Sequence, residues 1–320
     1  MQCCDGNMTG DFYGLPTRSL SNAHLCVEYL AEAGPRVVRL FVTGSAAGRN
    51  LLAELPEMAW PTPFGDYHVR GGHRLWHAPE AMPRTYVPDD HGLTITDVPG
   101  GVELRQPTEA ATGLRKSLVI HLHPDRPALT LTHRITNEGL WPMQLSPWAI
   151  TQLCLGGVVV LPQPGRSTDG NRLHPDRHLV LWPYARWNDP RLNLHDDYWL
   201  FQAQSGLPPC KFGYLNTQGW VGYLWEDVLF LKRFQPHAEL LHPDQNCNVE
   251  IYCNDRFVEL ETIAPLARLG PGERVTHVER WRFVTGLHAD STHAGVQALM
   301  RTIQREAASE SADADGAEAE

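Results

Sequence analysis

Residues 71–80 concentrate side chains that can transfer protons, hold polar groups and pack on rings. The segment reads Gly-Gly-His-Arg-Leu-Trp-His-Ala-Pro-Glu, and its candidate residues are His73, Arg74, Trp76, His77 and Glu80. Imidazole acts as a general acid near neutral pH, guanidinium presents a rigid fork of donors, and an indole face packs on the apolar face of a pyranose. We expect a sharply turning loop that forms part of a sugar site. The alternative is a loop whose polar groups only satisfy the backbone.

The same segment does not favour a metal centre. His73 and His77 have the spacing of a metal-binding pair on a helix, but the two glycines and Pro79 disfavour a helix here. The sequence also contains no Cys-x-x-Cys pair and no glycine-rich loop of the kind that cradles nucleotide phosphates. We therefore expect neither a metal nor an organic cofactor.

A pair of carboxylates follows the turn at Asn254-Asp255. In the strand expected after this turn, Glu259 and Glu261 are two residues apart and point to the same face. Two carboxylates in a poorly solvated cleft raise each other's pKa, which suits a general base. The alternative is a strand with one solvated polar face, which is common in antiparallel sheets.

A third candidate region is rich in aromatic residues. Residues 181–199 include Trp182 and Trp187 among prolines and polar side chains. Leaving such large rings exposed is costly, so they either pack as a lid or line a ligand groove. In the apolar segment at 228–234, one of Lys232 and Arg233 must face inward, where a charge needs a partner.

Short segments in which apolar residues recur at every second position, as in β-strands, must position these candidate site residues. In residues 128–136, Leu129, Leu131 and Ile135 share one face, and threonines and arginine share the other. About fifteen such segments are separated by Gly, Pro, Asn and Asp, and no βαβ alternation occurs. We expect an all-β fold of stacked antiparallel sheets, with one amphipathic helix over residues 292–305.

This pattern divides the chain into four parts. We expect a partly ordered N-terminal segment at 1–22, a β-sandwich at 23–287, a C-terminal helix within 288–305 and a disordered acidic tail at 306–320. The tail carries six acidic residues and no basic one, and its other residues are Ala, Ser and Gly. Such a segment cannot bury enough apolar surface to become ordered.

Charge and cysteine usage limit the classes of partner. The chain has 27 basic and 37 acidic residues, a formal net charge of −10, which disfavours nucleic acid and anionic membranes as partners. The seven cysteines, of which Cys3 and Cys4 are adjacent and the others scattered, suggest reduced thiols. Neither a signal peptide nor a membrane-length apolar run is recognisable. We expect a cytoplasmic protein whose partner is a mono- or oligosaccharide, and the sequence predicts no oligomeric state.

The C-terminal part resembles the end of aldose 1-epimerases, the galactose mutarotases. The similar residues are Leu260-Glu261-Thr262, Pro265, Leu269-Gly270-Pro271-Gly272-Glu273, His277 and Trp281-Arg282-Phe283. Residues 71–73 with Trp76 resemble the family segment that carries its first active-site histidine. From about residue 28 to 283 the chain resembles a branch of the galactose-mutarotase-like superfamily, through the blocks at 71–80, 136–142 and 254–262. The resemblance implies a β-supersandwich, with Glu261 as the catalytic base.

One departure from the family pattern concerns the general acid. True mutarotases have an Asn-His pair in mid-chain, whose histidine protonates the ring oxygen. The equivalent region here, residues 145–151, contains no histidine. We expect Trp148 to take part of that space. His73 and His77 are the nearest substitutes for the acid, with Arg74 and Trp76 positioning the sugar.

Three functions are compatible with these residues. The first is an aldose-1-epimerase-like enzyme that uses Glu261 and a histidine without metal. The second is a glycoside hydrolase or lyase that uses Glu80 with Glu261 or Glu259, in which the distance between the carboxyl groups sets the stereochemistry. The third is a sugar-binding protein without catalysis. All three require the early segment and the late strand to face one cleft.

Overall fold

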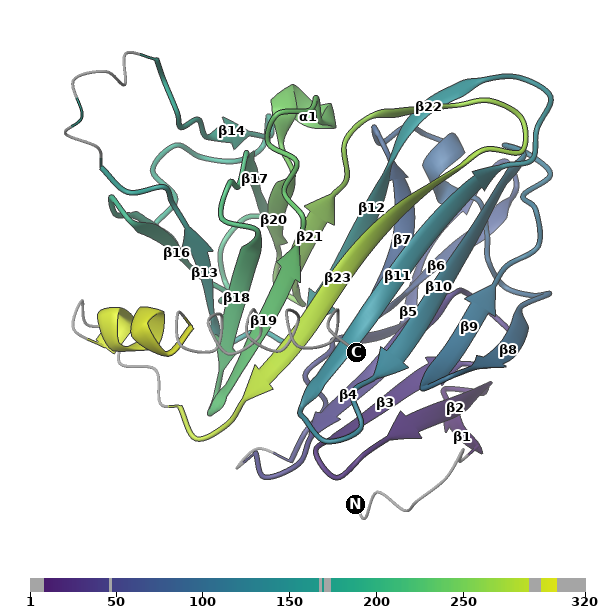
Figure 1. Ribbon diagram of the computed structural model, residues 1–320, viewed down its shortest axis with the longest axis horizontal. Coiled ribbons are helices and arrows are strands. Elements are labelled where there is room, and N and C mark those ends of the chain that lie inside the picture. Colours follow the sequence, from purple (N-terminus) through teal and green to yellow (C-terminus); the bar gives the residue numbers. More distant parts are fainter. Residues whose placement is uncertain (1–8, 46–47, 167–168, 170–173, 288–294, 304–320) are drawn as a thin grey trace, which may run out of the picture.

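Two large antiparallel sheets stacked face to face make up most of the computed structural model (Figure 1). The structure describes residues 9–45, 48–166, 169, 174–287 and 295–303. The first sheet has eleven strands, in the order β1 (Thr9–Phe12), β2 (Leu15–Ser21), β3 (Leu25–Leu30), β4 (Arg36–Val42), β7 (His73–Ala78), β12 (Met143–Leu153), β21 (Val258–Ile263), β20 (Val249–Cys253), β17 (Cys210–Tyr214) and β14 (Val180–Leu181), with β22 (Ala267–Leu269) paired to β12.

The second sheet has ten strands and completes the sandwich. Their order is β15 (Leu192–Leu194), β16 (Tyr198–Gln202), β13 (Val158–Pro162), β18 (Trp220–Trp225), β19 (Val228–Phe234), β23 (Arg274–Val284), β11 (Ala128–Asn137), β10 (Leu114–Leu122), β9 (Gly101–Arg105) and β8 (Thr94–Val98). A separate hairpin is formed by β5 (Glu54–Thr62) and β6 (Gly65–Gly71). The expected all-β class with antiparallel sheets is confirmed.

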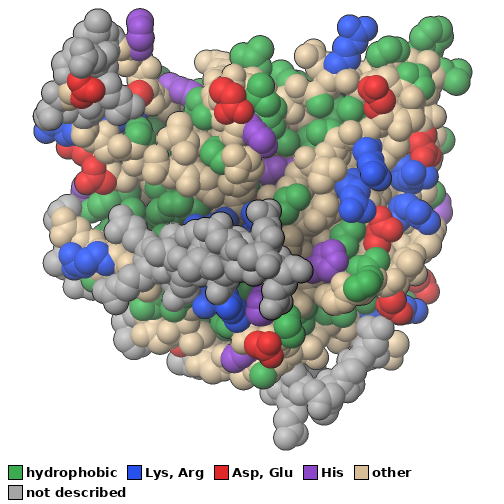
Figure 2. All heavy atoms as spheres, in the orientation of Figure 1, with side chains coloured by type: hydrophobic (Ala, Val, Ile, Leu, Met, Phe, Trp, Pro, Cys, Tyr) green, Lys and Arg blue, Asp and Glu red, His purple; other side chains and the backbone are tan. Residues whose placement is uncertain are grey.

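The period-two pattern explains the outer face of the second sheet. Along β11, buried and partly exposed residues alternate, so Leu129 and Leu131 enter the core and Arg134 faces outward. Charged side chains of both signs lie on this face (Figure 2), and Arg134 pairs with Glu103 at 3.3 Å. The central strand β21 is instead buried along its whole length.

The hairpin and a 3₁₀ turn, η1 (Arg84–Tyr86), cover part of the outer face of the first sheet. Tyr67 from the hairpin and Tyr86 from η1 pack against Trp76, with ring centroids 5.5 and 4.8 Å away. The Trp76 indole donates a 2.6 Å hydrogen bond to the Tyr67 hydroxyl, which satisfies the polar atom of a buried ring. The hairpin and η1 thus cover the outer face around Trp76.

The segment at 71–80 is a strand rather than the expected loop. Gly71 and Gly72 have φ of 87° and 69° and turn the chain from β6 into β7. A Cβ atom at Gly71 would lie 1.9 Å from the Ala53 carbonyl oxygen, so only glycine fits this turn. Beyond it, β7 pairs with β12 along its whole length.

The described chain ends add strands and a helix to the sandwich. Within the N-terminal segment, residues 9–12 and 15–21 form β1, at the edge of the first sheet, and β2 beside it. The C-terminal helix occupies residues 295–303 and packs Val296, Leu299 and Ile303 against the second sheet. The acidic tail at 306–320 lies outside the described residues. The cysteines that the structure describes are free thiols, and none of the described helices has the length and apolar character needed to cross a membrane.

A buried charge cluster fastens the hairpin to the first sheet. Arg36 of β4 and Arg70 of β6 both pair with Asp89, at 2.9 and 2.8 Å. Burial raises the pKa of the Asp89 carboxyl, but the charges of Arg36 and Arg70 overcome this and hold it at about 2. The cluster is thus stable only while Asp89 is ionised.

We expect Asp89 to make folding acid-sensitive. Because its pKa is lower in the folded protein than in the unfolded chain, its contribution is complete above about pH 4 and is lost as the pH falls to about 2. The contribution is about 2 kcal/mol. Urea unfolding at a series of pH values should show this loss, and Asp89→Asn should remove it. An unchanged acid dependence in the variant would contradict the assignment.

Candidate functional site

Strand register separates the expected site residues onto two faces of the first sheet. Across β7, β12 and β21, Arg74 lies opposite Ile150, which in turn lies opposite Glu261. Side chains alternate along each strand, so Arg74, Trp76, Glu259 and Glu261 share the outer face. His73 occupies the other face, which is turned towards the second sheet.

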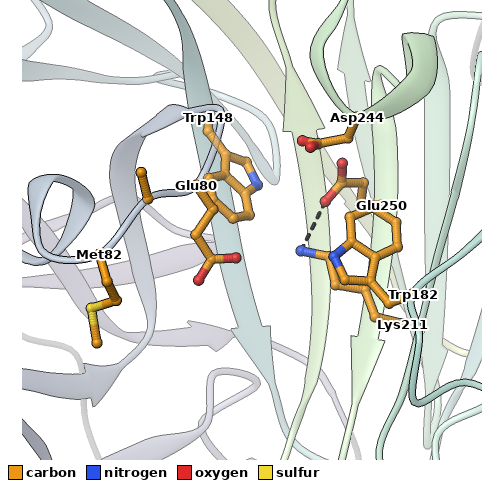
Figure 3. A pocket seen from close by; sticks show the side chains of 8 residues that line it. Glu80, Met82, Trp148, Trp182, Lys211, Asp244 and Glu250 are labelled. Carbon is orange, nitrogen blue, oxygen red and sulfur yellow. Dashed lines mark ion pairs between the residues drawn. The ribbon is translucent and has the colours of Figure 1, made fainter.

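A pocket of about 350 Å³ opens on the outer face beyond Trp148 (Figure 3). Its lining comes from the loop after β7, from β12, β17 and β20, from the segment after β14, and from the short turn α1 (Pro243–Asn246). The lining residues are Glu80, Ala81, Met82, Trp148, Trp182, Lys211, Asp244 and Glu250. This volume lies at the lower end of the range of small-molecule sites.

Lys211 links the pocket to the buried carboxylates. Its ammonium lies 2.8 Å from Oε2 of Glu250 and donates a 3.1 Å hydrogen bond to Oε2 of Glu261. The indole of Trp148 donates a second hydrogen bond to Glu261, at 2.7 Å. Lys211 also lies 4.6 Å from the Trp148 ring and 4.8 Å from the Trp182 ring. Glu261 is therefore fully buried beside the pocket, bonded to two of its lining residues.

Glu250 and Glu261 form a directly opposed pair across β20 and β21. Burial strongly raises the pKa of Glu250, Lys211 opposes this shift, and Glu261 adds to it. For Lys211, burial lowers the pKa of the ammonium group. The charges of Glu250 and Glu261 more than compensate and hold this pKa well above its usual range. The centre therefore carries a protonated Lys211 and a Glu250 that retains its proton to unusually high pH.

Arg74 and Glu259 lie deeper on the same face. Glu259 accepts hydrogen bonds from Arg74 at 3.2 Å and from Gln152 at 2.9 Å. Burial raises the pKa of Glu259 to about 7; Arg74 opposes the shift and Glu261 adds to it. Arg74 also stacks on Trp76 at 4.3 Å. Of the expected residues, Glu80, Trp148 and Trp182 line the pocket, whereas Arg74, Trp76, Glu259 and Glu261 lie behind or beside it.

The expected meeting of His73 or His77 with Glu261 does not occur. Both histidines are fully buried between the sheets, on the opposite face from Glu261. Burial lowers the pKa of each well below its usual value. Neither imidazole can reach a sugar in the pocket, so neither replaces the family's mid-chain histidine. Trp187 is 81% exposed and is also outside the pocket lining.

His73 belongs instead to a hydrogen-bonded chain between the sheets. Nδ1 of His133 lies 3.1 Å from the His277 carbonyl oxygen and so donates to it, which leaves Nε2 as an acceptor. Nε2 of His73, 2.7 Å away, must then donate to His133. Its Nδ1 accepts the hydroxyl proton of Thr151 at 2.9 Å, and Thr151 accepts from Lys232 at 2.7 Å. Partner geometry thus assigns both tautomers.

Glu279 belongs to the same interior network and pairs with Lys232. A charge facing inward at Lys232 or Arg233, with a partner, had been expected from the sequence. The charged groups of Lys232 and Glu279 lie 3.1 Å apart, and both side chains are fully buried. His73, His133 and Glu279 place potential metal-ligating atoms within 4.8 Å of one another. However, the 2.7 Å between the two imidazoles suits one shared proton, and Glu279 already accepts from Thr262, Lys232 and Trp281. Hydrogen bonding accounts for the arrangement.

Three charged residues of the pocket had not been identified from the sequence: Lys211, Asp244 and Glu250. Lys211 and Glu250 each interrupt an apolar strand, and a charge in a central strand of a sandwich needs a specific partner. That signal was available in the sequence. Asp244 carried no comparable signal, because its position depends on a turn with left-handed backbone at Asp244, Gln245 and Asn246.

Known structures share this fold at low sequence identity. A TPR-domain protein from Parabacteroides distasonis matches 86% of this chain with a TM-score of 0.57 and 14% identity, and this chain spans only 48% of its length. A galactose mutarotase-like protein from Lactobacillus casei matches 84% of this chain and 100% of its own, with a TM-score of 0.55 and 11% identity.

A proposed aldose 1-epimerase from Klebsiella pneumoniae matches 93% of this chain and 85% of its own, with a TM-score of 0.54 and 11% identity. No protein-family model matches the sequence, and no curated protein matches it. Identities this low establish the shared fold alone. The expected galactose-mutarotase-like architecture is confirmed.

Proposed function

We propose, from the premise that the chain has the galactose-mutarotase-like fold, that it interconverts the anomers of a monosaccharide bound in the Trp148–Trp182 pocket. Glu261 would be the general base and Glu250 the general acid. The observation that carries this proposal is the opposed carboxyl pair beside a sugar-sized pocket, joined by Lys211. Two carboxyl groups in such different environments suit opposite proton-transfer roles.

The proposed reaction moves two protons and breaks one bond. Glu261 accepts the proton of the anomeric hydroxyl while Glu250 donates its proton to the ring oxygen, and the C1–O5 bond opens to give the aldehyde. Rotation about C1–C2 followed by the reverse transfers closes the other anomer and restores both carboxyl groups. Glu261 is fully buried, so the proposal includes displacement of the Lys211 ammonium as the sugar enters.

The test is anomer exchange measured by NMR exchange spectroscopy on a panel of aldoses at equilibrium. The expected result is a protein-dependent increase in exchange for at least one sugar. A folded protein that accelerates exchange of no aldose would contradict the proposal. Saturable binding without acceleration would instead favour the sugar-binding alternative.

One observation favours a second candidate, a glycoside hydrolase. Glu80 faces Lys211 and Glu250 across the pocket (Figure 3), so two carboxyl groups lie on facing walls. Such a pair can act as acid and base at a glycosidic bond. Release of a reducing sugar from aryl glycosides or oligosaccharides, lost in Glu80→Gln, would support hydrolysis over anomer exchange.

We expect Glu259 to set a pH dependence of the exchange rate. With a pKa of about 7, its protonated form hydrogen-bonds Glu261 and competes with the sugar for that carboxylate. Ionisation of Glu259 removes this bond, so the rate should rise as the pH passes through about 7. Exchange rates measured from about pH 5.5 to 8.5 should show this rise. The rise near neutral pH should be absent in Glu259→Gln. A rise that persists in the variant would assign the titration to another group.

A further inference from the structure

The described residues that line the pocket have an imbalance of charge. Glu80, Asp244 and Glu250 are acidic, and Lys211 is basic. The Lys211 ammonium is already bonded to Glu250 and to Glu261 behind the lining. Among the described residues of the lining, no cation is thus left to balance Glu80 and Asp244.

Glu250 gives the acidic wall a buried acceptor that is built into the fold. Its side chain is fully buried, and Oε1 receives no hydrogen bond from a nitrogen or hydroxyl group in the part of the chain that the structure describes. Figure 3 shows its carboxyl group beside that of Asp244, across the pocket from Glu80. The space between the two walls therefore presents carboxyl oxygens from both sides.

The turn α1 holds Asp244 over this space. Asp244, Gln245 and Asn246 have φ of 51°, 59° and 69°, an uncommon run of left-handed residues. The Cys247 amide closes the turn by donating to the Pro243 carbonyl at 3.0 Å, and the Asn246 side chain accepts from the His242 amide at 2.9 Å. Asp244 is consequently held by backbone geometry, and Asn can occupy the same conformation.

We propose that this pocket binds an amino sugar, with its ammonium group between Glu80 on one wall and Asp244 and Glu250 on the other. The inference rests on the proposed function, because it takes the pocket to be the sugar site and adds the class of sugar. An ammonium offers three donors and a positive charge, so it satisfies the acceptors and the charge together. A hydroxyl supplies one donor and no positive charge, and a phosphate or carboxylate is repelled.

The titration behaviour of Asp244 agrees with this charge pattern. Burial raises its pKa, Lys211 opposes the shift, and Glu261 and Glu80 add to it. The pocket thus disfavours its own negative charge when empty. A bound cation removes that cost, which couples ammonium binding to ionisation of Asp244.

The experiment is an NMR titration that follows the indole N–H signals with D-glucosamine, D-glucose, N-acetyl-D-glucosamine and D-glucose 6-phosphate. It is performed at a pH where the glucosamine amine is protonated. We expect D-glucosamine to bind about tenfold more tightly than D-glucose or the acetylated sugar, and the phosphate to bind most weakly. Asp244→Asn should bring D-glucosamine to the affinity of D-glucose, and Glu80→Gln should act in the same direction. Asp66→Asn, at an exposed position near the start of β6, is the matched control and should change nothing.

The outcomes separate this inference from the proposed function. D-glucose binding as tightly as D-glucosamine overturns the inference but leaves anomer exchange intact. Preferred D-glucosamine binding without any anomer exchange supports the inference and contradicts the proposed reaction. Binding of no sugar overturns both. Saturable binding of calcium chloride that Asp244→Asn abolishes, without preference for D-glucosamine, also overturns the inference.

Discussion

Glu261→Gln is expected to lower the rate of anomer exchange by about 10²–10⁴-fold, the contribution typical of a general base. The amide keeps the size of the side chain, and its oxygen can still accept the hydrogen bonds that Trp148 and Lys211 now make to Glu261. It cannot accept the anomeric proton. Sugar affinity should therefore change far less than the rate, which exchange spectroscopy and binding titration measure separately.

Two further variants make this expectation specific. Glu250→Gln should cause a similar loss of rate. The double variant should be little slower than either single variant, because the effects of removing an acid and a base that act in one step are not additive. Glu103→Gln, a surface carboxylate on β9, is the control and should retain the full rate. A folded Glu261→Gln protein that kept more than about a tenth of the rate would exclude Glu261 as the base.

The strand pattern made the architecture predictable from the sequence. Residues 128–136 were expected as a strand and form most of β11, because their alternation identifies a buried face. The loop expected at 71–80 is a strand because the glycine pair accommodates the turn before it, leaving residues 73–78 free to pair with β12. A glycine pair marks a turn without showing where the turn ends.

The face assignment of β7 could not be read from its sequence. Alternation places His73 and His77 on one side and Arg74 and Trp76 on the other, but all four side chains are buried. Polarity therefore distinguishes neither face: one is covered by the second sheet and the other by the hairpin and η1. Only the pairing with β12 and β21, some 70 and 190 residues away, shows which side carries Glu261.

The interior pair Lys232–Glu279 is expected to have the largest effect on stability. Lys232→Met leaves a fully buried carboxylate without its ammonium partner, and should lower the free energy of unfolding by about 3–5 kcal/mol. Burial raises the pKa of Glu279, but the charge of Lys232 holds it well below its usual range, so the carboxylate remains ionised in the native protein. Urea unfolding at pH 7 measures the loss.

A double variant distinguishes charge burial from lost packing. Lys232→Met with Glu279→Gln removes both charges, so it should recover part of the stability lost by Lys232→Met alone. Arg134→Met, which breaks the surface pair with Glu103, is the control and should cost about 0–1 kcal/mol. If Lys232→Met cost no more than this control, Glu279 would have to be neutral in the folded protein.

Lys232→Met should also affect the outer face of the first sheet, because Lys232 is hydrogen-bonded to the backbone of β21. Lys232 donates a 2.8 Å hydrogen bond to the Leu260 carbonyl, immediately before Glu261 on β21. Loss of this hydrogen bond makes β21 less rigid next to Glu261, the proposed base, although Lys232 does not line the pocket. The rate of anomer exchange should therefore be lower in Lys232→Met, even without urea, where the protein is fully folded. Arg134→Met should leave this rate unchanged. Equal rates in the two variants would show that the interior network supports stability alone.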